Sequence, residues 1–183
     1  MKFYDGIISF SFKSIEKGLI GLAFRYRDAF NYYIFEISRS KEELESFKRI
    51  RKVKDGISTE LIKIADGGFI ENLWHRVEIQ FQMDRIQVSI EERINDNKNK
   101  KGNNNGPIVF QVFDGDLVYG TLALIVANVS MVYFQELRFE RLNCVNIGSY
   151  SNEDINKNSP GLIYHSSTCS RFKENYEASF DFM

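Results

Sequence analysis

Three consecutive stretches decide the fold class: Trp74–Phe81 (WHRVEIQF), Met83–Arg85 (MDR) and Ile86–Ile90 (IQVSI). In the first stretch apolar side chains alternate with polar ones, and the same alternation returns in the third. Successive side chains of a strand point to opposite faces, so a period of two residues is typical of a half-buried strand. Two such runs joined by a short polar turn predict an antiparallel β-hairpin.

The same pattern continues on both sides of this hairpin. Further strands are expected at Gly6–Lys13, Gly18–Tyr26, Tyr32–Ser38, Phe47–Val53, Leu61–Ile64, Ile108–Phe113, Gly120–Ala127 and Met131–Phe139. Ser40 and Glu43 have the spacing of a capping box, which predicts a short helical turn at 41–45 before the strand that follows. Many short strands with turns between them and little helix predict an all-β protein, a two-sheet antiparallel β-sandwich.

Composition agrees with a globular domain and limits its partners. Of the 183 residues, 43% are hydrophobic and 14% aromatic, enough to build a core, which excludes wholesale disorder. The 24 Lys and Arg residues are balanced by 25 Asp and Glu, so no nucleic-acid partner is expected. A run of about 18 apolar residues is missing, so direct membrane insertion is not expected either.

We expect one sandwich domain over residues 1–143, followed by a strap or linker over 144–183. Within the sandwich, residues 95–106 are almost entirely Asn, Lys and Gly and predict a surface loop. The tail is rich in Asn, Ser and Gly, with isolated apolar patches. We interpret the chain as a piece of a longer secretory-pathway protein, with an intracellular protein at its natural start as the alternative.

Cys144 and Cys169 are the two cysteines of the chain. They do not supply the four ligands that structural zinc prefers. A disulfide between them would tie the tail to the sandwich and would suit an oxidising compartment, with two unrelated free thiols as the alternative. Asn128-Val-Ser matches the N-glycosylation sequon in a predicted turn, which agrees with secretion, although such triplets often arise by chance.

Residues 39–54 hold seven cations against three carboxylates. If this segment is a strand, Arg49 and Arg51 lie on one face. There they could bind a sulfated glycan or an acidic protein patch, and a solvated sheet face is the alternative.

The order of the segments resembles the concanavalin-like jelly rolls of the laminin-G type, and among them the C-terminal lectin-like domain of thrombospondins. The resemblance spans about residues 6–142 and is carried by three pairs of stretches: Gly21–Tyr26 with Tyr32–Ile37, Leu73–Ile79 with Ile86–Ile90, and Asp116–Leu124 with Met131–Phe139. Within these stretches Trp74 is expected to bury its ring in the core, and His75 to point outward. Gly120 is expected to allow a backbone bend before an inner strand.

The resemblance implies a candidate cofactor, because laminin-G-like domains often bind calcium at the rim of the sandwich. Asp28, Asp114 and Asp116 are the candidate oxygen donors. The alternative is that Asp114-Gly-Asp116 forms an ordinary turn, for which Asp and Gly are well suited.

Enzymes built on this jelly roll cleave glycans with two carboxylates on the concave face. Glu91 and Glu92 are adjacent and therefore point to opposite faces of a strand. Glu136 and Glu140 share a face, but Arg138 lies on it as well. Neither a nucleophile elbow nor a phosphate-binding glycine loop is present. We therefore expect no enzyme activity.

Together these features predict a non-catalytic recognition or adhesion domain of a secreted or cell-surface protein, with a protein or a glycan as its ligand. One alternative is a jelly-roll enzyme that processes glycans. The other is a structural scaffold domain that packs against further domains of a longer chain.

Overall fold

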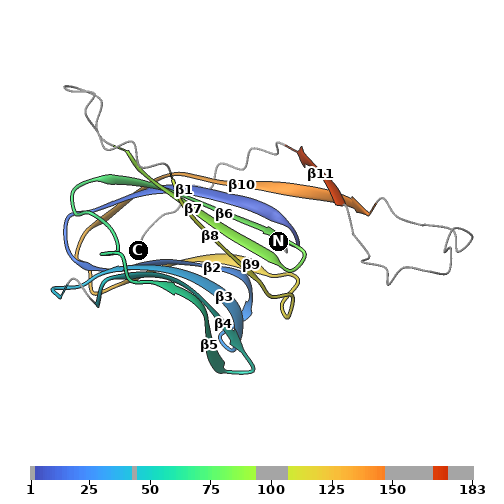
Figure 1. The fold of residues 1–183 in the computed structure, drawn as a ribbon, viewed down its shortest axis with the longest axis horizontal. Coiled ribbons are helices and arrows are strands. Elements are labelled where there is room, and N and C mark those ends of the chain that lie inside the picture. The colour runs from blue at the N-terminus through green and yellow to red at the C-terminus, as the bar shows by residue number, and fades with distance from the viewer. Residues whose placement is uncertain (1–2, 43–44, 94–106, 147–166, 173–183) are drawn as a thin grey trace, which may run out of the picture.

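The computed structural model describes residues 3–42, 45–93, 107–146 and 167–172. Its strands form two sheets that lie face to face (Figure 1). The strands are β1 (Gly6–Ser14), β2 (Gly18–Asp28), β3 (Asn31–Arg39), β4 (Phe47–Lys54), β5 (Ile57–Ile64), β6 (Trp74–Gln82), β7 (Arg85–Arg93), β8 (Ile108–Phe113), β9 (Thr121–Ala127), β10 (Val132–Asn146) and β11 (Ser167–Phe172). The loop predicted at 95–106 lies outside the described residues.

The six-stranded sheet has the order β11-β10-β1-β6-β7-β8, and the five-stranded sheet has the order β5-β4-β3-β2-β9. Every pair of neighbouring strands is antiparallel. The predicted two-sheet antiparallel sandwich is therefore confirmed. In the described part of the chain, no helix has the length and apolar character needed to cross a membrane.

The hairpins form where the alternating patterns predict them. β6 and β7 pair with Val77 opposite Ile90 and Phe81 opposite Ile86, so both apolar sets lie on one face. The Asp55-Gly56 turn joins β4 to β5, and both residues have positive φ angles (51° and 79°) that suit a tight hairpin turn. At the predicted helical turn the structure describes a contact from the Glu45 amide to the Glu42 carbonyl oxygen, while residues 43–44 are not described.

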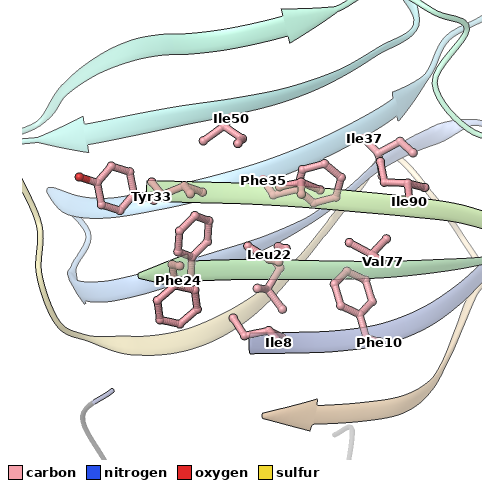
Figure 2. Close-up of a cluster of buried hydrophobic side chains, with 14 of the residues drawn as sticks. Ile8, Phe10, Leu22, Phe24, Tyr33, Phe35, Ile37, Ile50, Val77 and Ile90 are labelled. Atoms are coloured by element: carbon pink, nitrogen blue, oxygen red, sulfur yellow. The ribbon is translucent and has the colours of Figure 1, made fainter. Parts of the chain in front are cut away.

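The core lies between the sheets and is rich in aromatic rings (Figure 2). Phe24 of β2 stacks on Tyr33 of β3 at 5.6 Å between ring centroids. Phe24 also stacks at 5.5 Å on Phe81 of β6, which belongs to the opposite sheet. Each buried Phe contributes roughly 1.5–3 kcal/mol through removal of apolar surface from water. The apolar side chains that alternate along the strands thus form the contact that holds the two sheets together.

Gly120 is needed for a close backbone approach, and the bend expected there stays a prediction. It pairs with Phe3 in an isolated bridge, with N–O distances of 2.8 and 3.0 Å. A Cβ atom at this position would collide with the backbone of Arg25 and Tyr26. Phe3 is thereby fixed beside the start of β9.

The expected orientations of Trp74 and His75 are wrong. His75 is 1% exposed and its ring stacks on Phe12 at 5.1 Å, whereas Trp74 is only half-buried. The amino group of Lys13 lies 5.4 Å from the Trp74 ring and 5.1 Å from the Tyr133 ring. Alternation explains this result, because His75 has the same parity as the buried Val77 and its neighbour must therefore face outward.

The buried His75 should make the protein less stable in mild acid. Its Nε2 atom lies 3.2 Å from the amide nitrogen and 2.9 Å from the carbonyl oxygen of Ile70. Burial lowers the pKa of His75, and nearby Lys48 adds to this, against the opposing effects of Ile70 and Glu92. The unfolded chain binds the extra proton first, so the stability present above about pH 6.5 is lost as the pH falls below that value.

Urea unfolding at about pH 7.5 and pH 5.5 tests this effect. Between these pH values we expect protonation of His75 to lower the free energy of unfolding of the wild type by up to about 1.4 kcal/mol. This value corresponds to one pH unit below the ordinary histidine pKa. His75→Phe should remove that part of the loss, whereas His165→Gln, the matched control at the other histidine, should retain it. Equal pH dependence in His75→Phe and wild type would contradict the assignment.

Part of the C-terminal tail belongs to the six-stranded sheet. β10 continues past the expected domain boundary at 143, and β11 pairs with this extension. The register places Cys144 directly opposite Cys169. Directly opposed residues of antiparallel strands have Cα atoms about 4.5–5.5 Å apart, which lies within the range that a disulfide spans. The disulfide stays a prediction, and this register is compatible with it.

Candidate binding face

The outer face of the five-stranded sheet is the candidate site. Figure 1 shows this sheet arched, with its outer face on the inside of the arch. β4 turns Ile50 to the core and therefore presents Arg49 and Arg51 on the outer face, as predicted for one side of a strand. The register with β3 puts Glu36 opposite Arg49, and Ile34 opposite Arg51.

Glu36, whose side chain is only 4% exposed, holds both arginines in place. Its Oε2 atom accepts hydrogen bonds from Nε of Arg49 at 2.6 Å and from Nε of Arg51 at 2.7 Å. Its Oε1 atom accepts a further bond from Nη2 of Arg51 at 2.8 Å. Arg51 also donates to the hydroxyl of Ser58 at 2.8 Å, and Arg49 lies 3.7 Å from the carboxylate of Glu60. We call these five residues the Glu36 network.

The Glu36 network stays ionised at neutral pH. Burial by itself would raise the pKa of Glu36, but the hydrogen bonds and positive charges of Arg51 and Arg49 outweigh burial and lower it. The bond to Glu36 in turn raises the pKa of Arg51. A glycosidase acid needs the opposite shift, because it must hold a proton near neutral pH. Glu36 is therefore suited to positioning the arginines and unsuited to donating a proton.

The aromatic ring of Phe47 packs against Arg49, near the start of β4. The guanidinium carbon of Arg49 lies 4.4 Å from the ring centroid of Phe47, and the amino group of Lys63 lies 5.0 Å from it. Cations at this distance are attracted to the ring face, with about 0.5–1 kcal/mol at exposed positions. Phe47 thereby limits the movement of both cations.

At this end the face opens into a groove of about 430 Å³. We call it the cationic groove, because four positively charged side chains line it. Its lining includes Lys17, Arg39, Lys41, Arg49, Phe47 and Asn128. The groove therefore joins the Glu36 network through Arg49, which belongs to both.

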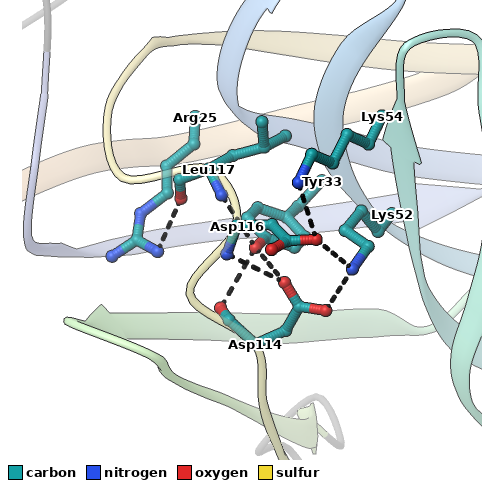
Figure 3. Close-up of polar contacts among 7 residues, drawn as sticks. All are labelled: Arg25, Tyr33, Lys52, Lys54, Asp114, Asp116 and Leu117. Atoms are coloured by element: carbon teal, nitrogen blue, oxygen red, sulfur yellow. Dashed lines mark hydrogen bonds and ion pairs between the residues drawn. The ribbon is translucent and has the colours of Figure 1, made fainter.

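The structure does not group the three candidate calcium ligands. Lys52 lies between Asp114 and Asp116, at 2.5 and 2.7 Å, and Lys54 lies 3.3 Å from Asp116 (Figure 3). Asp28 instead accepts a hydrogen bond from its own turn, from the amide of Phe30 at 2.7 Å. Within the described residues, no three His, Cys, Asp or Glu side chains are placed to hold a metal ion. The calcium prediction thus finds no support, and Lys52 supplies the positive charge at the Asp114-Gly-Asp116 turn.

The contacts of Asp114 connect the two sheets. Tyr33 donates a hydrogen bond to its carboxylate at 2.5 Å, and the amide of Leu117 donates to the Tyr33 hydroxyl at 3.2 Å (Figure 3). Burial, together with the bond to Asp114, raises the pKa of Tyr33. Although burial opposes it, the pKa of Asp114 is lowered by Lys52 and Tyr33. The connection from β8 to β9 is thereby fixed to β3 and β4.

The carboxylates considered for catalysis lie elsewhere. Glu91 and Glu92 are exposed on β7, opposite Arg76 and His75. Glu136 lies on β10 with a positive φ of 55° and borders a small pocket of about 100 Å³ on the outer face of the six-stranded sheet. None of these three belongs to the Glu36 network or lines the cationic groove.

The sequon residue Asn128 is exposed in the turn after β9, with a positive φ of 59°. Its place on the wall of the cationic groove could not be read from the sequence. Sequence reasoning also missed the role of Glu36, which stands alone on its strand. The only available signal was the density of cations in the neighbouring segment 39–54.

No family model matches the chain, and no curated protein sequence matches it. Solved structures do. The carbohydrate-binding module CBM66 from Bacillus subtilis superposes with a TM-score of 0.55 at 16% sequence identity, covering 75% of each chain. CG-16, a homodimeric agglutinin from chicken liver, gives a TM-score of 0.49 at 12% identity and covers 74% of this chain and 95% of that one.

A toad ovary galectin in complex with thio-digalactose gives a TM-score of 0.48 at 10% identity, covering 74% of this chain and 97% of that one. At such identities a likeness shows the fold alone, and the agglutinin and the galectin fall below a TM-score of 0.5. The sheets, their order and the match to the carbohydrate-binding module agree with each other. The chain is an all-β sandwich with the concanavalin-like fold.

Proposed function

We propose that this chain is a non-catalytic glycan-binding domain and that its ligand lies on the outer face of the five-stranded sheet. The Glu36 network carries the proposal. Two guanidinium groups are held by one buried carboxylate, so little conformational freedom is lost when a ligand binds.

The chemistry of the network suits sugar hydroxyls. Each guanidinium has five N–H donors, more than the three hydrogen bonds that Arg51 makes, so donors remain for a ligand. Glu60 and Ser58 add acceptors beside them. The carbohydrate-binding module that shares this fold is by its name a binder of carbohydrate, which supports the same class of ligand.

Glycan-array screening followed by calorimetry tests the proposal. Arg51→Ala should weaken binding of any glycan found by at least about tenfold, or roughly 1.4 kcal/mol. Arg76→Ala, the matched control on the outer face of the six-stranded sheet, should bind as the wild type does. Arg51→Lys, which keeps the charge but lacks the planar fork, should be nearly as weak as Arg51→Ala.

Two results would overturn this function: no glycan bound by the wild type, or equal losses in Arg51→Ala and Arg76→Ala. A thermal melt of each variant separates loss of binding from loss of folding. If Arg51→Ala does not fold, the affinity of Arg51→Lys decides the test.

The compartment belongs to the proposal as well. We place the domain in a secreted or cell-surface protein, where glycans are accessible, and the exposed Asn128 sequon agrees with this placement. An adhesive role like that of thrombospondin C-terminal domains is the narrower form of the same proposal. It rests on the sequence resemblance alone.

A further inference from the structure

The cationic groove has an excess of positive charge that the protein does not neutralise. Lys17 and Lys41 are exposed, and within the described residues neither takes part in an ion pair. Arg39 donates to the carbonyl oxygen of Gly67 at 2.8 Å, which is an uncharged partner. Arg49 shares the carboxylate of Glu36 with Arg51 and lies 3.7 Å from that of Glu60, which is on the network side. The part of the groove that the structure describes is lined by no Asp or Glu.

Three separate loops and strand ends bring these cations together. Lys17 precedes β2, Arg39 ends β3, Lys41 follows it, and Arg49 lies near the start of β4. Charges of one sign gathered around a concave surface reinforce each other and attract a counter-ion of opposite sign. Among the described residues that line the groove none is a carboxylate, and Glu45 behind it accepts from the hydroxyl of Ser40 at 2.9 Å. The complementary group is therefore an anion supplied by a ligand.

The groove also has an apolar part, which distinguishes a sugar from a free anion. Phe47 and Leu19 line it beside the cations. Ligand sites commonly combine apolar surface with a few charged groups that fix orientation. A sugar ring can cover Phe47 and Leu19 while its anionic substituent meets the cations, whereas an inorganic anion makes only the second contact.

We infer that the cationic groove selects glycans that carry sulfate or carboxylate groups, an inference that rests on the proposed function of the adjoining face. Arg49 and Arg51 are two positions apart on β4, about 6.7 Å along the strand. A glycan bound at the Glu36 network therefore extends over Arg49 into the groove. Its hydroxyls bind the network, and its anionic group binds Lys17, Arg39 and Lys41.

Calorimetry on the whole chain, produced in bacteria so that Asn128 carries no glycan, tests the inference. The probes are a heparin-derived hexasaccharide, its counterpart that is desulfated, N-acetylated and carboxyl-reduced and therefore uncharged (called the desulfated hexasaccharide), inorganic sulfate and a phosphoserine peptide of equal charge. We expect the sulfated hexasaccharide to bind at least about tenfold more tightly than the desulfated one and to weaken with added salt. Sulfate alone and the peptide should bind far more weakly.

The variant Lys17→Gln/Lys41→Gln should lose about tenfold in affinity for the sulfated hexasaccharide and keep its affinity for the desulfated one. The charge-matched control is Arg27→Gln/Arg141→Gln, which removes two exposed cations outside the groove. The control should change the affinity by less than about twofold, because exposed charges outside the contact contribute little.

Equal binding of the two hexasaccharides, equal losses in the groove variant and its control, or a peptide that binds as tightly as the sulfated glycan would each overturn the inference. These results differ from those expected if the proposed function is wrong. If it is wrong, the wild type binds neither the desulfated hexasaccharide nor any neutral glycan. Even then, tighter binding of the sulfated hexasaccharide that depends on Lys17 and Lys41 would support the inference that the groove binds anionic groups.

Discussion

Replacing Arg25 with methionine is expected to lower the free energy of unfolding by about 3–5 kcal/mol, as for other broken buried charge pairs. Arg25 is 1% exposed. Its guanidinium donates to the carbonyl oxygen of Leu117 at 2.9 Å, to that of Tyr4 at 3.3 Å and to the carboxylate of Asp5 at 3.1 Å. Methionine fills similar space and supplies none of these donors, so the carbonyl oxygen of Leu117 loses its Arg25 donor inside the protein.

The effect is large because Arg25 connects segments that no strand pairing joins to it. It links the chain before β1 to β2 through Tyr4 and Asp5. Its bond to Leu117, in the connection between β8 and β9, is drawn in Figure 3. The guanidinium carbon also lies 5.3 Å from the ring of Phe81, in the opposite sheet. Loss of Arg25 therefore loosens the contact between the sheets at this end.

Chemical denaturation of Arg25→Met and Arg27→Met measures the difference. Arg27 is exposed two positions along the same strand, and its guanidinium lies 4.3 Å from the Tyr119 ring. We expect less than about 1 kcal/mol of destabilisation for Arg27→Met. A loss below about 1 kcal/mol for Arg25→Met would contradict the role given to its buried hydrogen bonds.

Nothing in the local sequence marks Arg25 as buried. Arg25 lies between Phe24 and Tyr26, so alternation of apolar and polar residues places its side chain on the outer face. The structure has an irregularity in the pairing of β2 with β3 after Phe24, and Arg25 has a positive φ of 48°. A β-bulge of this kind changes the direction of side chains, and a single sequence gives no signal for where it occurs.

The sandwich itself could be predicted, because alternation is a local property. Consistent use of alternation would also have placed His75 inside and Trp74 outside. The expectation for Trp74 followed the general preference of large rings for the core, and parity along β6 overrides that preference here.

The binding face could be predicted only in part, because it depends on which strands pair. The density of cations around Arg49 and Arg51 was visible in the sequence. Their shared partner Glu36 lies on the preceding strand, and the register that joins them is set by the hairpin. In the same way, the resemblance makes Asp114 and Asp116 candidate calcium ligands, with an ordinary turn as the alternative, because the sequence cannot place Lys52, more than sixty positions earlier, beside them.

Replacing Gly68 with alanine is expected to lower the free energy of unfolding by about 2–5 kcal/mol, in two separable parts. Gly68 has a positive φ of 70°, which costs an alanine about 1–2 kcal/mol. A Cβ atom there would also collide with the carbonyl oxygen of Ser38 and lie 2.8 Å from its carbonyl carbon. Relief of such a clash requires movement of the backbone, which typically costs about 1–3 kcal/mol.

Gly56→Ala separates the two parts, because Gly56 has a similar φ of 79° without backbone in the way. The nearest atom to a Cβ at Gly56 is Cδ1 of Phe30 at 3.3 Å, on a side chain that can move. We expect Gly56→Ala to lose only the first part, about 1–2 kcal/mol. Denaturation curves that show equal losses for the two variants would mean that the segment around Gly68 moves freely.

The same pair of variants connects the fold to the cationic groove. Ser38 and Arg39 line the groove, and Arg39 is held by the carbonyl oxygen of Gly67. If Gly68→Ala pushes the segment away from Ser38, Arg39 loses its support, and affinity for the sulfated hexasaccharide should fall together with stability. Gly56→Ala, at the β4–β5 turn, should keep that affinity. Full affinity in a destabilised Gly68→Ala would show that the position of Arg39 does not matter for the ligand.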